Sequence, residues 1–237
     1  MKAVILAGGK GTRLAPYTRV FPKPMLPIGD KTILEILLLQ LKRAGVDEVV
    51  LTVGHLAGLM RAFFADGSQY GLKIGYGYEP HPLGTAGPLA QVGGLDETFI
   101  VTNGDVLTTL DIADLLRYHR EHGAVATIAS HRRQVHIDLG VIETCTDHMI
   151  CDYVEKPTID YLVSMGIYVF EPQVLNYIPK GEYLDFPVLV KKLLADEKAV
   201  AAYPFEGYWQ DLGRPDDYEQ AVEDFDHMRK QFLPEED

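Results

Sequence analysis

Two patterns of apolar residues alternate along the first 130 positions of the chain. Short runs rich in β-branched residues are followed by segments in which apolar residues recur at helical spacing. This alternation predicts βαβ units around a largely parallel sheet. The predicted strands are Ala3–Ala7, Val49–Val53, Lys73–Tyr78, Thr98–Thr102 and Ala124–Ala129. The predicted helices are Thr32–Ala44, Ala57–Phe64, Ala86–Val92 and Ile112–His122.

The first of these helices has start and stop signals of its own. Thr32 and Glu35 have the spacing of a capping box, in which each side chain accepts a hydrogen bond from the other residue's backbone N–H. Gly45 stands where a glycine commonly ends a helix. We therefore expect a helix over 32–44 that packs its apolar face on the sheet.

After about residue 135 the rhythm changes to strands separated by turn residues. We predict strands at Gly140–Glu143, Met149–Val154, Val163–Phe170, Ala199–Tyr203 and Tyr208–Asp211, and helices at Pro172–Tyr177, at Phe186–Ala195 and from Pro215 onward. No repeat, linker or low-complexity tract interrupts the 237 residues. The pattern predicts one α/β domain with a Rossmann-like, doubly wound, three-layer α/β/α architecture and a mixed sheet, divided into a first half (1–130) and a second half (131–237).

Charge is distributed unevenly along this chain. The 22 basic and 34 acidic residues give a net charge of −12, which argues against nucleic acid as a partner. Yet residues 1–29 contain five basic residues and no acidic residue. An acid-free N-terminal stretch in an acidic protein is consistent with a site for a small anion, although chance in a short window gives the same pattern.

The two cysteines, Cys145 and Cys151, are too few for a disulfide framework and lack the paired spacing of a zinc or redox site. We expect both to be reduced thiols. The N-terminal apolar run is too short for a signal peptide, and no run approaches the ~20 residues that cross a bilayer. These features predict a cytoplasmic protein with no membrane partner. The sequence leaves open whether the protein is a homo-oligomer.

A glycine-rich loop follows the first predicted strand directly. Gly8, Gly9 and Gly11 allow the backbone to curl with its amides exposed, which is how phosphate-binding loops are built. The loop matches neither the Walker A pattern nor G-x-G-x-x-G, and a plain structural turn is an equally ordinary interpretation. Arg13 and Lys23, which lies among prolines that fix its direction, add two cations to the loop.

Longer motifs extend from this loop through most of the chain. They are Gly8–Leu14 with Pro16, Thr18 and Lys23-Pro24, then Pro82–Gly87, Asn103-Gly104-Asp105, Val154–Pro157, Gly166–Tyr168 and Trp209–Gly213. Together they resemble the sugar-1-phosphate nucleotidylyltransferases, also called NDP-sugar pyrophosphorylases. The resemblance implies attack by a sugar 1-phosphate oxygen on the α-phosphorus of a nucleoside triphosphate, with pyrophosphate leaving.

The resemblance also implies a role for each site residue. Arg13 and the loop amides would hold the departing phosphates and Lys23 the α-phosphoryl group, while Asp105 and Asp211 would hold Mg²⁺. The implied nucleotide contacts are Leu6, Ala7, Gly8, Gly9, Gly11, Thr12, Glu79, Gly84 and Thr85. The implied sugar-phosphate contacts are Gly140, Glu155, Lys156 and Ser164. The first half would then bind the nucleotide and the second half the sugar phosphate.

Glu79 bears on the choice of base. A carboxylate accepts two hydrogen bonds from the N1–H and 2-amino groups of guanine, whereas uracil and thymine present a mixed edge that suits an amide. Glu79 therefore favours GTP, and the surrounding motif looks most like the mannose-1-phosphate and heptose-1-phosphate guanylyltransferases. A surface glutamate is an equally ordinary interpretation, so thymidylyl, uridylyl or cytidylyl transfer stays open. Ser164 stands where the family often has asparagine, which leaves the sugar open.

Two other functional classes fit the sequence less well. A regulatory subunit that only senses an NDP-sugar need not keep the cations Arg13 and Lys23 together with Asp105 and Asp211, and all four are present. An NAD-dependent oxidoreductase would need G-x-G-x-x-G after the first strand and an acidic residue about 20 positions later. The sequence has neither feature.

Overall fold

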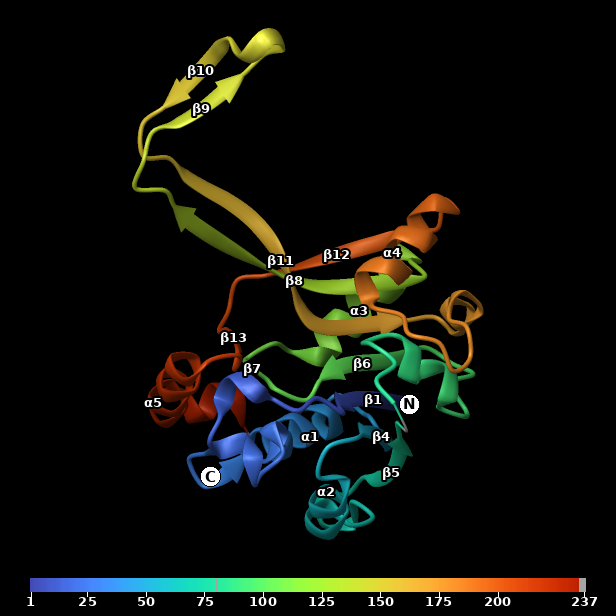
Figure 1. Ribbon diagram of the computed structural model, residues 1–237. Helices are drawn as coiled ribbons and strands as arrows, with labels where there is room; N and C mark the ends of the chain where they lie inside the picture. Colours follow the sequence, from blue (N-terminus) through green and yellow to red (C-terminus); the bar gives the residue numbers. More distant parts are fainter. Residues whose placement is uncertain (80, 235–237) are drawn as a thin grey trace.

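A computed structural model describes residues 1–79 and 81–234 of the chain. Within these residues seven strands form one central sheet, which runs through the body of the molecule in Figure 1. In the order in which they lie, the strands are β12 (Val200–Phe205), β8 (Ala126–His136), β11 (Thr158–Phe170), β6 (Phe99–Asn103), β1 (Lys2–Ala7), β4 (Glu48–Val53) and β5 (Lys73–Tyr78).

The sheet is mixed in direction. Strands β6, β1, β4 and β5 are parallel to one another, whereas β11 is antiparallel to both β6 and β8, and β12 is parallel to β8. The carboxyl ends of the four parallel strands therefore lie at one edge of the sheet, where open α/β sheets bind their ligands.

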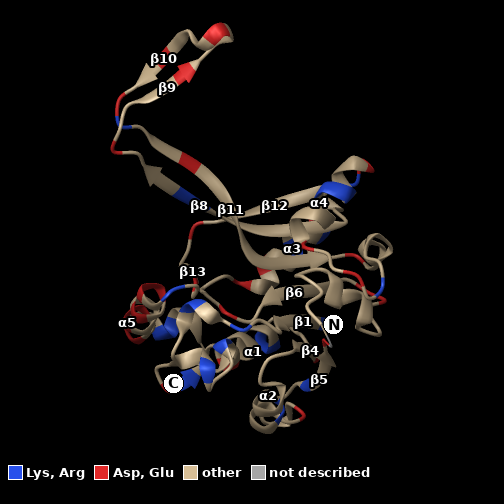
Figure 2. Ribbon diagram, in the orientation of Figure 1, with Lys and Arg blue, Asp and Glu red and all other residues tan. Residues whose placement is uncertain are grey.

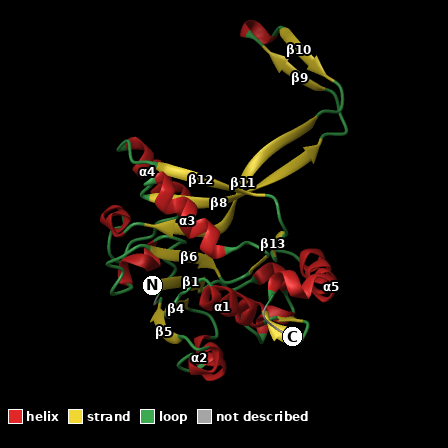
Figure 3. Ribbon diagram, turned by 180° about the vertical axis from the view of Figure 1, so that it is seen from behind, coloured by secondary structure: helices red, strands yellow, loops and turns green. Residues whose placement is uncertain are grey.

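Helices cover both faces of the sheet, as Figure 3 shows from behind. They are α1 (Ile33–Arg43), α2 (Ala57–Phe64), α3 (Ile112–His122), α4 (Phe186–Ala195) and α5 (Pro215–Phe232). Side chains of α1, α2 and α3 share one buried cluster with β1 and β4, and side chains of α4 share a second with β6 and β11. A third cluster joins α5 to α1 and the N-terminal loops. The predicted three-layer α/β/α class is confirmed.

The predicted capping box forms at the start of α1. The Glu35 N–H donates to Thr32 Oγ1 at 3.2 Å, and the Thr32 N–H donates to Glu35 Oε2 at 2.7 Å. Gly45, just beyond the helix, has a φ of +84°, which an L side chain rarely adopts. The boundaries of the predicted helix are thus confirmed to within a residue.

Two of the predicted helices are 3₁₀ helices and not α-helices. Segments 86–92 and 172–177 contain the 3₁₀ turns η5 (Gly87–Gln91) and η7 (Pro172–Tyr177). The N–H groups of Ala86 and Gly87 both donate to the Leu184 carbonyl, so a distant loop takes the donors at the start of η5. Both segments are short and have a proline in the first turn, which removes a further donor.

Two-stranded sheets complete the body. Strand β2 (Pro27–Ile28) pairs with β3 (Lys31–Thr32), and β7 (Val106–Thr108) pairs with β13 (Trp209–Asp211). Strand β7 follows β6 and strand β13 precedes α5, so the second pair joins these two parts of the chain. Among the described residues, no helix combines the length and the apolar character needed to cross a membrane.

Strands β8 and β11 continue beyond the sheet as an antiparallel ribbon. It leads into a second hairpin of β9 (Val141–Thr144) and β10 (Ile150–Val154), and both Figures 1 and 3 show this hairpin standing away from the body. We call residues 132–162 the arm. The predicted strand 163–170 is correct at its end, but the observed strand begins five residues earlier, at Thr158.

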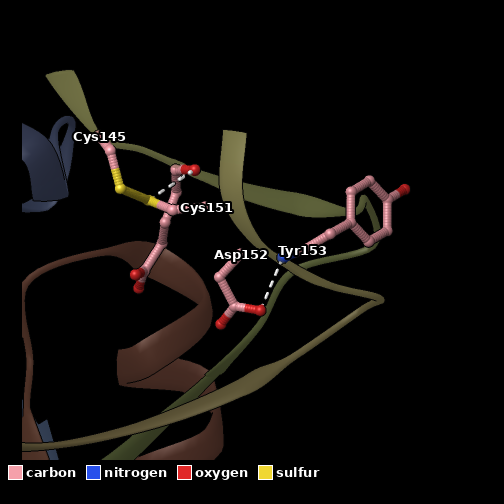
Figure 4. Close-up of a disulfide and its surroundings, with 5 residues drawn as sticks. Cys145, Cys151, Asp152 and Tyr153 are labelled. Carbon is pink, nitrogen blue, oxygen red and sulfur yellow. Dashed lines mark hydrogen bonds between the residues drawn. A yellow bond between two sulfur atoms is a disulfide. The ribbon is translucent and has the colours of Figure 1, made fainter. Parts of the chain in front are cut away.

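The tip of the arm corrects the prediction that both cysteines are thiols. Cys145 and Cys151 form a disulfide, with their Cα atoms 5.8 Å apart (Figure 4). The residues flank the turn between β9 and β10, so the hairpin brings their backbones to the separation that a disulfide needs. The spacing in sequence gave no such indication, because it is the hairpin that sets the distance.

Candidate active site

A cleft of about 710 Å³ lies at the carboxyl ends of the parallel strands. Its walls come from the loops after β1, β4, β5 and β6, together with a loop before α4. The lining residues are Leu6, Ala7, Gly8, Gly9, Lys10, Gly11, Arg13, Lys23, Pro24, Gly54, His55, Glu79, His81, Pro82, Leu83, Gly84, Thr85, Asn103, Asp105, Tyr183 and Asp185. This position is the one expected for a nucleotide in an open α/β sheet.

The glycine-rich loop forms one wall of the cleft. Gly11 has a φ of +59°, and its carbonyl accepts a hydrogen bond from Thr18 Oγ1 at 2.8 Å. In the described part of the chain, the N–H groups of Gly9, Lys10 and Gly11 donate to no other protein group. Successive backbone N–H groups without partners in a glycine-rich loop are the donors from which anion-binding nests are built. Thr12, which was predicted to contact the nucleotide, begins the 3₁₀ turn η1 (Thr12–Leu14) and lies outside the lining.

Lys23 connects this loop to the predicted metal-binding residues. It begins the turn η3 (Lys23–Met25), is only 9% exposed, and its Nζ donates to Asp105 Oδ2. The same Nζ lies 3.8 Å from Asp211 Oδ1. The structure therefore brings together three residues that are up to 188 positions apart in sequence.

Pairing between β7 and β13 places the two aspartates side by side. Asp105 lies between β6 and β7, and Asp211 ends β13 opposite Val106. The Leu212 N–H donates to the Asp105 carbonyl at 3.3 Å, which adds a backbone hydrogen bond between the two aspartate-bearing segments. Partial burial and then the negative charge of Asp105 raise the pKa of Asp211, against the opposing charges of Lys23 and Arg13. The two carboxylates thus repel each other unless a cation lies between them.

The donor set is suited to magnesium. Mg²⁺ is usually held by one or two carboxylates, with substrate phosphates and waters completing its octahedron. Asp105 and Asp211 are two such carboxylates, and both lie beside Lys23, with Asp105 in the cleft lining. Within residues 1–79 and 81–234, no group of three or more histidines, cysteines, aspartates and glutamates is placed to hold a metal by itself. The pair therefore fits a metal that arrives with phosphate oxygens.

Glu79 faces the glycine-rich loop from the opposite wall. A Cβ on Gly8 would come within 2.7 Å of Glu79 Oε1, so only glycine allows this carboxylate to approach the loop so closely. Burial raises the pKa of Glu79, and a hydrogen bond from the backbone of Leu83 opposes the shift. The Glu79 side chain is thus a partly buried hydrogen-bond acceptor in the wall of the cleft.

Gly84 and Thr85 lie in the same wall, but Thr85 has structural partners. Its N–H donates to Asp185 Oδ1 at 2.9 Å, and its hydroxyl accepts from the Phe186 N–H at 2.8 Å, at the start of α4. Gly84 has a φ of +77° and packs against the Leu184 carbonyl. The pair therefore joins the Pro82–Gly87 loop to the loop before α4.

The four predicted sugar-phosphate contacts lie elsewhere. Gly140, Glu155, Lys156 and Ser164 are outside the cleft lining. Glu155 and Lys156 form an exposed elbow of the arm, and Tyr153 donates a hydrogen bond to Glu155 Oε2 at 3.2 Å. Ser164, at the base of the arm, donates to the Tyr168 hydroxyl at 3.0 Å. The structure thus brings most of the predicted nucleotide contacts together with Lys23, Asp105 and Asp211, and not with these four residues.

Sequence reasoning missed several residues of the lining. His55 directly follows β4, and the same rule that placed the other loops at the sheet edge would have found it. Tyr183 and Asp185 reach the cleft from a loop 100 residues beyond the Leu83–Thr85 wall, and Tyr183 donates to Asp185 Oδ2 at 2.6 Å. No local pattern signals that long-range approach.

Comparison with known proteins identifies the family. The model for nucleotidyl transferases matches residues 2–227. The chain belongs to this nucleotidyl transferase family. The cleft at the sheet edge and the glycine-rich loop are thus parts of a member of this family.

Two relatives of the chain are named for different bases. The chain is 37% identical to UTP–glucose-1-phosphate uridylyltransferase from Synechocystis, over 94% of this chain and 62% of that protein. It is 39% identical to mannose-1-phosphate guanylyltransferase from Mycobacterium tuberculosis, over 91% of this chain and 62% of the relative. The chain thus spans less than two thirds of the length of either relative.

A solved structure shares the fold. HddC from Yersinia pseudotuberculosis, in complex with GMP-PN, superimposes with a TM-score of 0.71 and 25% identity over 94% of this chain and 99% of the other. The fold predicted from the alternating strands and helices is therefore that of a known nucleotide-bound protein.

Proposed function

We propose that this chain transfers a nucleotidyl group from a nucleoside triphosphate to a sugar 1-phosphate. One observation carries the proposal, namely the convergence of Lys23, Asp105 and Asp211 at the mouth of a loop with unpaired backbone donors. A protein that only binds a nucleotide needs the donors but not the carboxylate pair. Transfer at phosphorus needs both, because the carboxylate pair would hold the cation that neutralises negative charge on the reacting group.

The reaction needs no general base, since the attacking sugar phosphate oxygen is already anionic. Lys23 would direct its ammonium at the α-phosphoryl group, while Arg13 and the N–H groups of Gly9–Gly11 hold the leaving pyrophosphate. Catalysis then rests on alignment of the two phosphates and on charge neutralisation.

Asp105 and Asp211 would hold Mg²⁺ in this proposal. When bound, the metal supplies positive charge to the phosphate oxygens. The chain's own part is to keep two carboxylates adjacent through the β7–β13 pairing, despite their mutual repulsion. Lys23, which contacts both, offsets that repulsion in the free protein.

GTP is the proposed nucleotide. Glu79 is partly buried in the cleft wall beside Gly8. Its carboxylate matches the two adjacent hydrogen-bond donors of guanine. The guanylyltransferase relative and the GMP-PN complex favour this choice, and the uridylyltransferase relative favours the alternative. The position of Glu79 in the cleft is the observation on which we base the choice of GTP.

Pyrophosphate release provides the test. Each of GTP, UTP, dTTP and CTP is paired with mannose, glucose and heptose 1-phosphates, with and without magnesium. We expect release with GTP in the presence of magnesium and a sugar 1-phosphate. Greater turnover with UTP or dTTP would overturn the guanine assignment alone, whereas no release with any pair would overturn the proposed function.

A further inference from the structure

The proposed reaction leaves one aromatic residue of the cleft without a role. Tyr183 belongs to the lining, and it is 64% exposed, so most of its surface is free of contacts with the protein. Its hydroxyl donates to Asp185 Oδ2 at 2.6 Å. An open aromatic ring in a binding cleft offers a flat apolar face to a ligand. Tyr183 is therefore a candidate for direct contact with the nucleotide.

The loop that carries Tyr183 is held against the loop that leads into η5. The Leu184 N–H donates to the Leu83 carbonyl at 2.9 Å, and the Leu184 carbonyl accepts from the Ala86 N–H at 2.8 Å. Gly84 permits this approach, since a Cβ there would come within 2.5 Å of the Leu184 carbonyl oxygen. The backbone next to Tyr183 is therefore fixed relative to the cleft wall.

The hydroxyl end of Tyr183 is fixed as well. Asp185, which binds this hydroxyl through Oδ2, accepts hydrogen bonds on Oδ1 from the Thr85 N–H at 2.9 Å and the Thr85 hydroxyl at 3.2 Å. The hydrogen bond from Tyr183 lowers the pKa of Asp185, and it raises the pKa of the tyrosine. Near neutral pH the carboxylate is thus charged and the phenol is neutral, so the hydrogen bond is kept. A ring held in this way loses little conformational freedom when a ligand binds.

Charge distinguishes the walls of the cleft. The lysines and arginines of the lining all come from the first 25 residues, and they are Lys10, Arg13 and Lys23. Of the lining carboxylates, Asp105 pairs with Lys23, whereas Glu79 and Asp185 lie in the walls outside this segment. In Figure 2 the acidic residues of the loop that leads into α4 are red. A triphosphate is attracted to the cations and repelled by the carboxylates, so the space beside Tyr183 is left to the uncharged base.

An aromatic ring distinguishes bases by the area of their faces. Every base stacks on an aromatic side chain, and the preference among bases follows from the strength of stacking. A purine has two fused rings and a pyrimidine has one, so a purine covers more of the tyrosine. This contribution is independent of the hydrogen bonds that Glu79 offers, because those reach the edge of the base and not its face.

We infer that Tyr183 stacks on the base of the bound nucleoside triphosphate and favours purines over pyrimidines. The inference rests on the proposed function for the presence of a nucleotide in the cleft. Glu79 and Tyr183 then act on different parts of the base, since the carboxylate contacts its edge and the ring contacts its face. Asp185 is a positioning residue, because it acts through the phenol that it holds.

Nucleotide binding without a sugar phosphate tests the stacking. Isothermal titration calorimetry with magnesium measures the affinity of the wild type, Tyr183→Ala and Tyr183→Phe for GTP and for UTP. We expect Tyr183→Ala to weaken GTP binding by about 5- to 150-fold, the usual range for the loss of one base stack, and to weaken UTP binding by a smaller factor. Tyr183→Phe keeps the ring and loses only the hydrogen bond to Asp185, so its loss should be smaller than that of Tyr183→Ala.

A fluorescent base gives a second readout, which a merely structural role of Tyr183 would not change. The triphosphate of 2-aminopurine riboside keeps the 2-amino group of guanine, and its fluorescence falls when the base stacks on an aromatic ring. At saturating nucleotide, we expect quenching with the wild type and with Tyr183→Phe, and much weaker quenching with Tyr183→Leu. Equal quenching with Tyr183→Leu and the wild type overturns the inference.

Tyr177 supplies the matched control. Its hydroxyl also donates to an aspartate, Asp196, at 3.0 Å, but the residue is outside the cleft lining. Tyr177→Ala and Tyr177→Phe should therefore bind GTP and UTP as the wild type does. Circular dichroism of each variant verifies the fold, which Tyr183→Ala should keep because Tyr183 is exposed.

The binding assays separate failure of the inference from failure of the proposed function. Equal affinity of the wild type and Tyr183→Ala for GTP overturns the inference, while pyrophosphate release by the same wild-type protein keeps the proposed function. A loss of equal size for GTP and UTP overturns the preference for purines. Weaker GTP binding by Tyr183→Ala supports the inference even when no pair of substrates releases pyrophosphate, and in that case the proposed function fails by itself.

Discussion

Individual residues at the cleft have separable roles. Arg13 lies beside Gly213 and lines the cleft in which we propose that the nucleotide binds. Its charge also lowers the pKa of Asp211, so it belongs to the electrostatic environment of the carboxylate pair. No buried contact of the core depends on it, because the residue is exposed.

Arg13→Ala should therefore remove turnover and leave the fold intact. We expect kcat with GTP and a sugar 1-phosphate to fall by about 10²–10³-fold, the usual effect of removing one donor that stabilises developing charge. Arg43→Ala, which removes an exposed arginine at the end of α1, is the control. Unchanged kcat with an unchanged circular dichroism spectrum would remove Arg13 from the site.

Glu79→Gln should change the preferred base. The amide presents one donor and one acceptor, so it loses the match to guanine and gains one to uracil and thymine. We expect kcat/KM for GTP to fall by about 10- to 100-fold, since hydrogen bonds to a charged group are worth about 1.5–3 kcal/mol each. Steady-state kinetics with GTP, UTP and dTTP measure the ratio. An unaltered ratio would place Glu79 outside base recognition.

The same substitution should stabilise the free protein at neutral pH. The pKa of Glu79 is raised in the folded state by burial, so between its ordinary and its raised value the folded chain holds a proton that the unfolded chain has released. Stability contributed by this group therefore falls as pH rises through that window. Thermal melts at pH 7 should show a higher Tm for Glu79→Gln than for wild type.

Below about pH 4 the difference should disappear, because Glu79 is protonated in both states. Glu182→Gln, which removes an exposed carboxylate, is the matched control and should shift neither melt. A Tm difference that persists at low pH would assign the gain to packing instead of charge.

At the scale of elements, most of the strands and helices could be predicted because apolar periodicity is a local property. α1 is the clearest case, since its cap, its apolar face and its terminal glycine all lie within 14 residues. The two 3₁₀ turns could not be predicted as such, because η5 depends on the Leu184 carbonyl nearly 100 residues away. Long-range partners decide the type of a short helix.

Thr32→Ala should measure the local contribution at α1. The substitution leaves the Glu35 N–H without its acceptor and costs about 1 kcal/mol of unfolding free energy, the typical value for a lost N-cap. Urea denaturation reports the loss as a lower midpoint with an unchanged slope. Thr146→Ala at the exposed tip of the arm is the control and should leave the midpoint in place.

The candidate site also contains residues that could be predicted from the sequence and residues that could not. The glycine-rich loop, Lys23, Asp105 and Glu79 could be predicted because each follows a strand or a motif, and the sheet edge brings them together. The contribution of Tyr183 and Asp185 could not, since it depends on packing between α4 and the Pro82–Gly87 loop. The Cys145–Cys151 disulfide escaped prediction for a similar reason, because hairpin register sets the distance between the two residues.

At the scale of the whole molecule, the position of β11 has a consequence for synthesis on the ribosome. β11 lies between β6 and β8, yet residues 158–170 are translated long after β6. The strands β1, β4, β5 and β6 are complete by residue 103 and already carry the glycine-rich loop and Glu79. The cluster beneath α4 must wait for Phe186, Leu189 and Leu193. We therefore expect the nascent chain to form its parallel half first, and to close the remaining edge of the sheet only when the last third of the chain has left the exit tunnel.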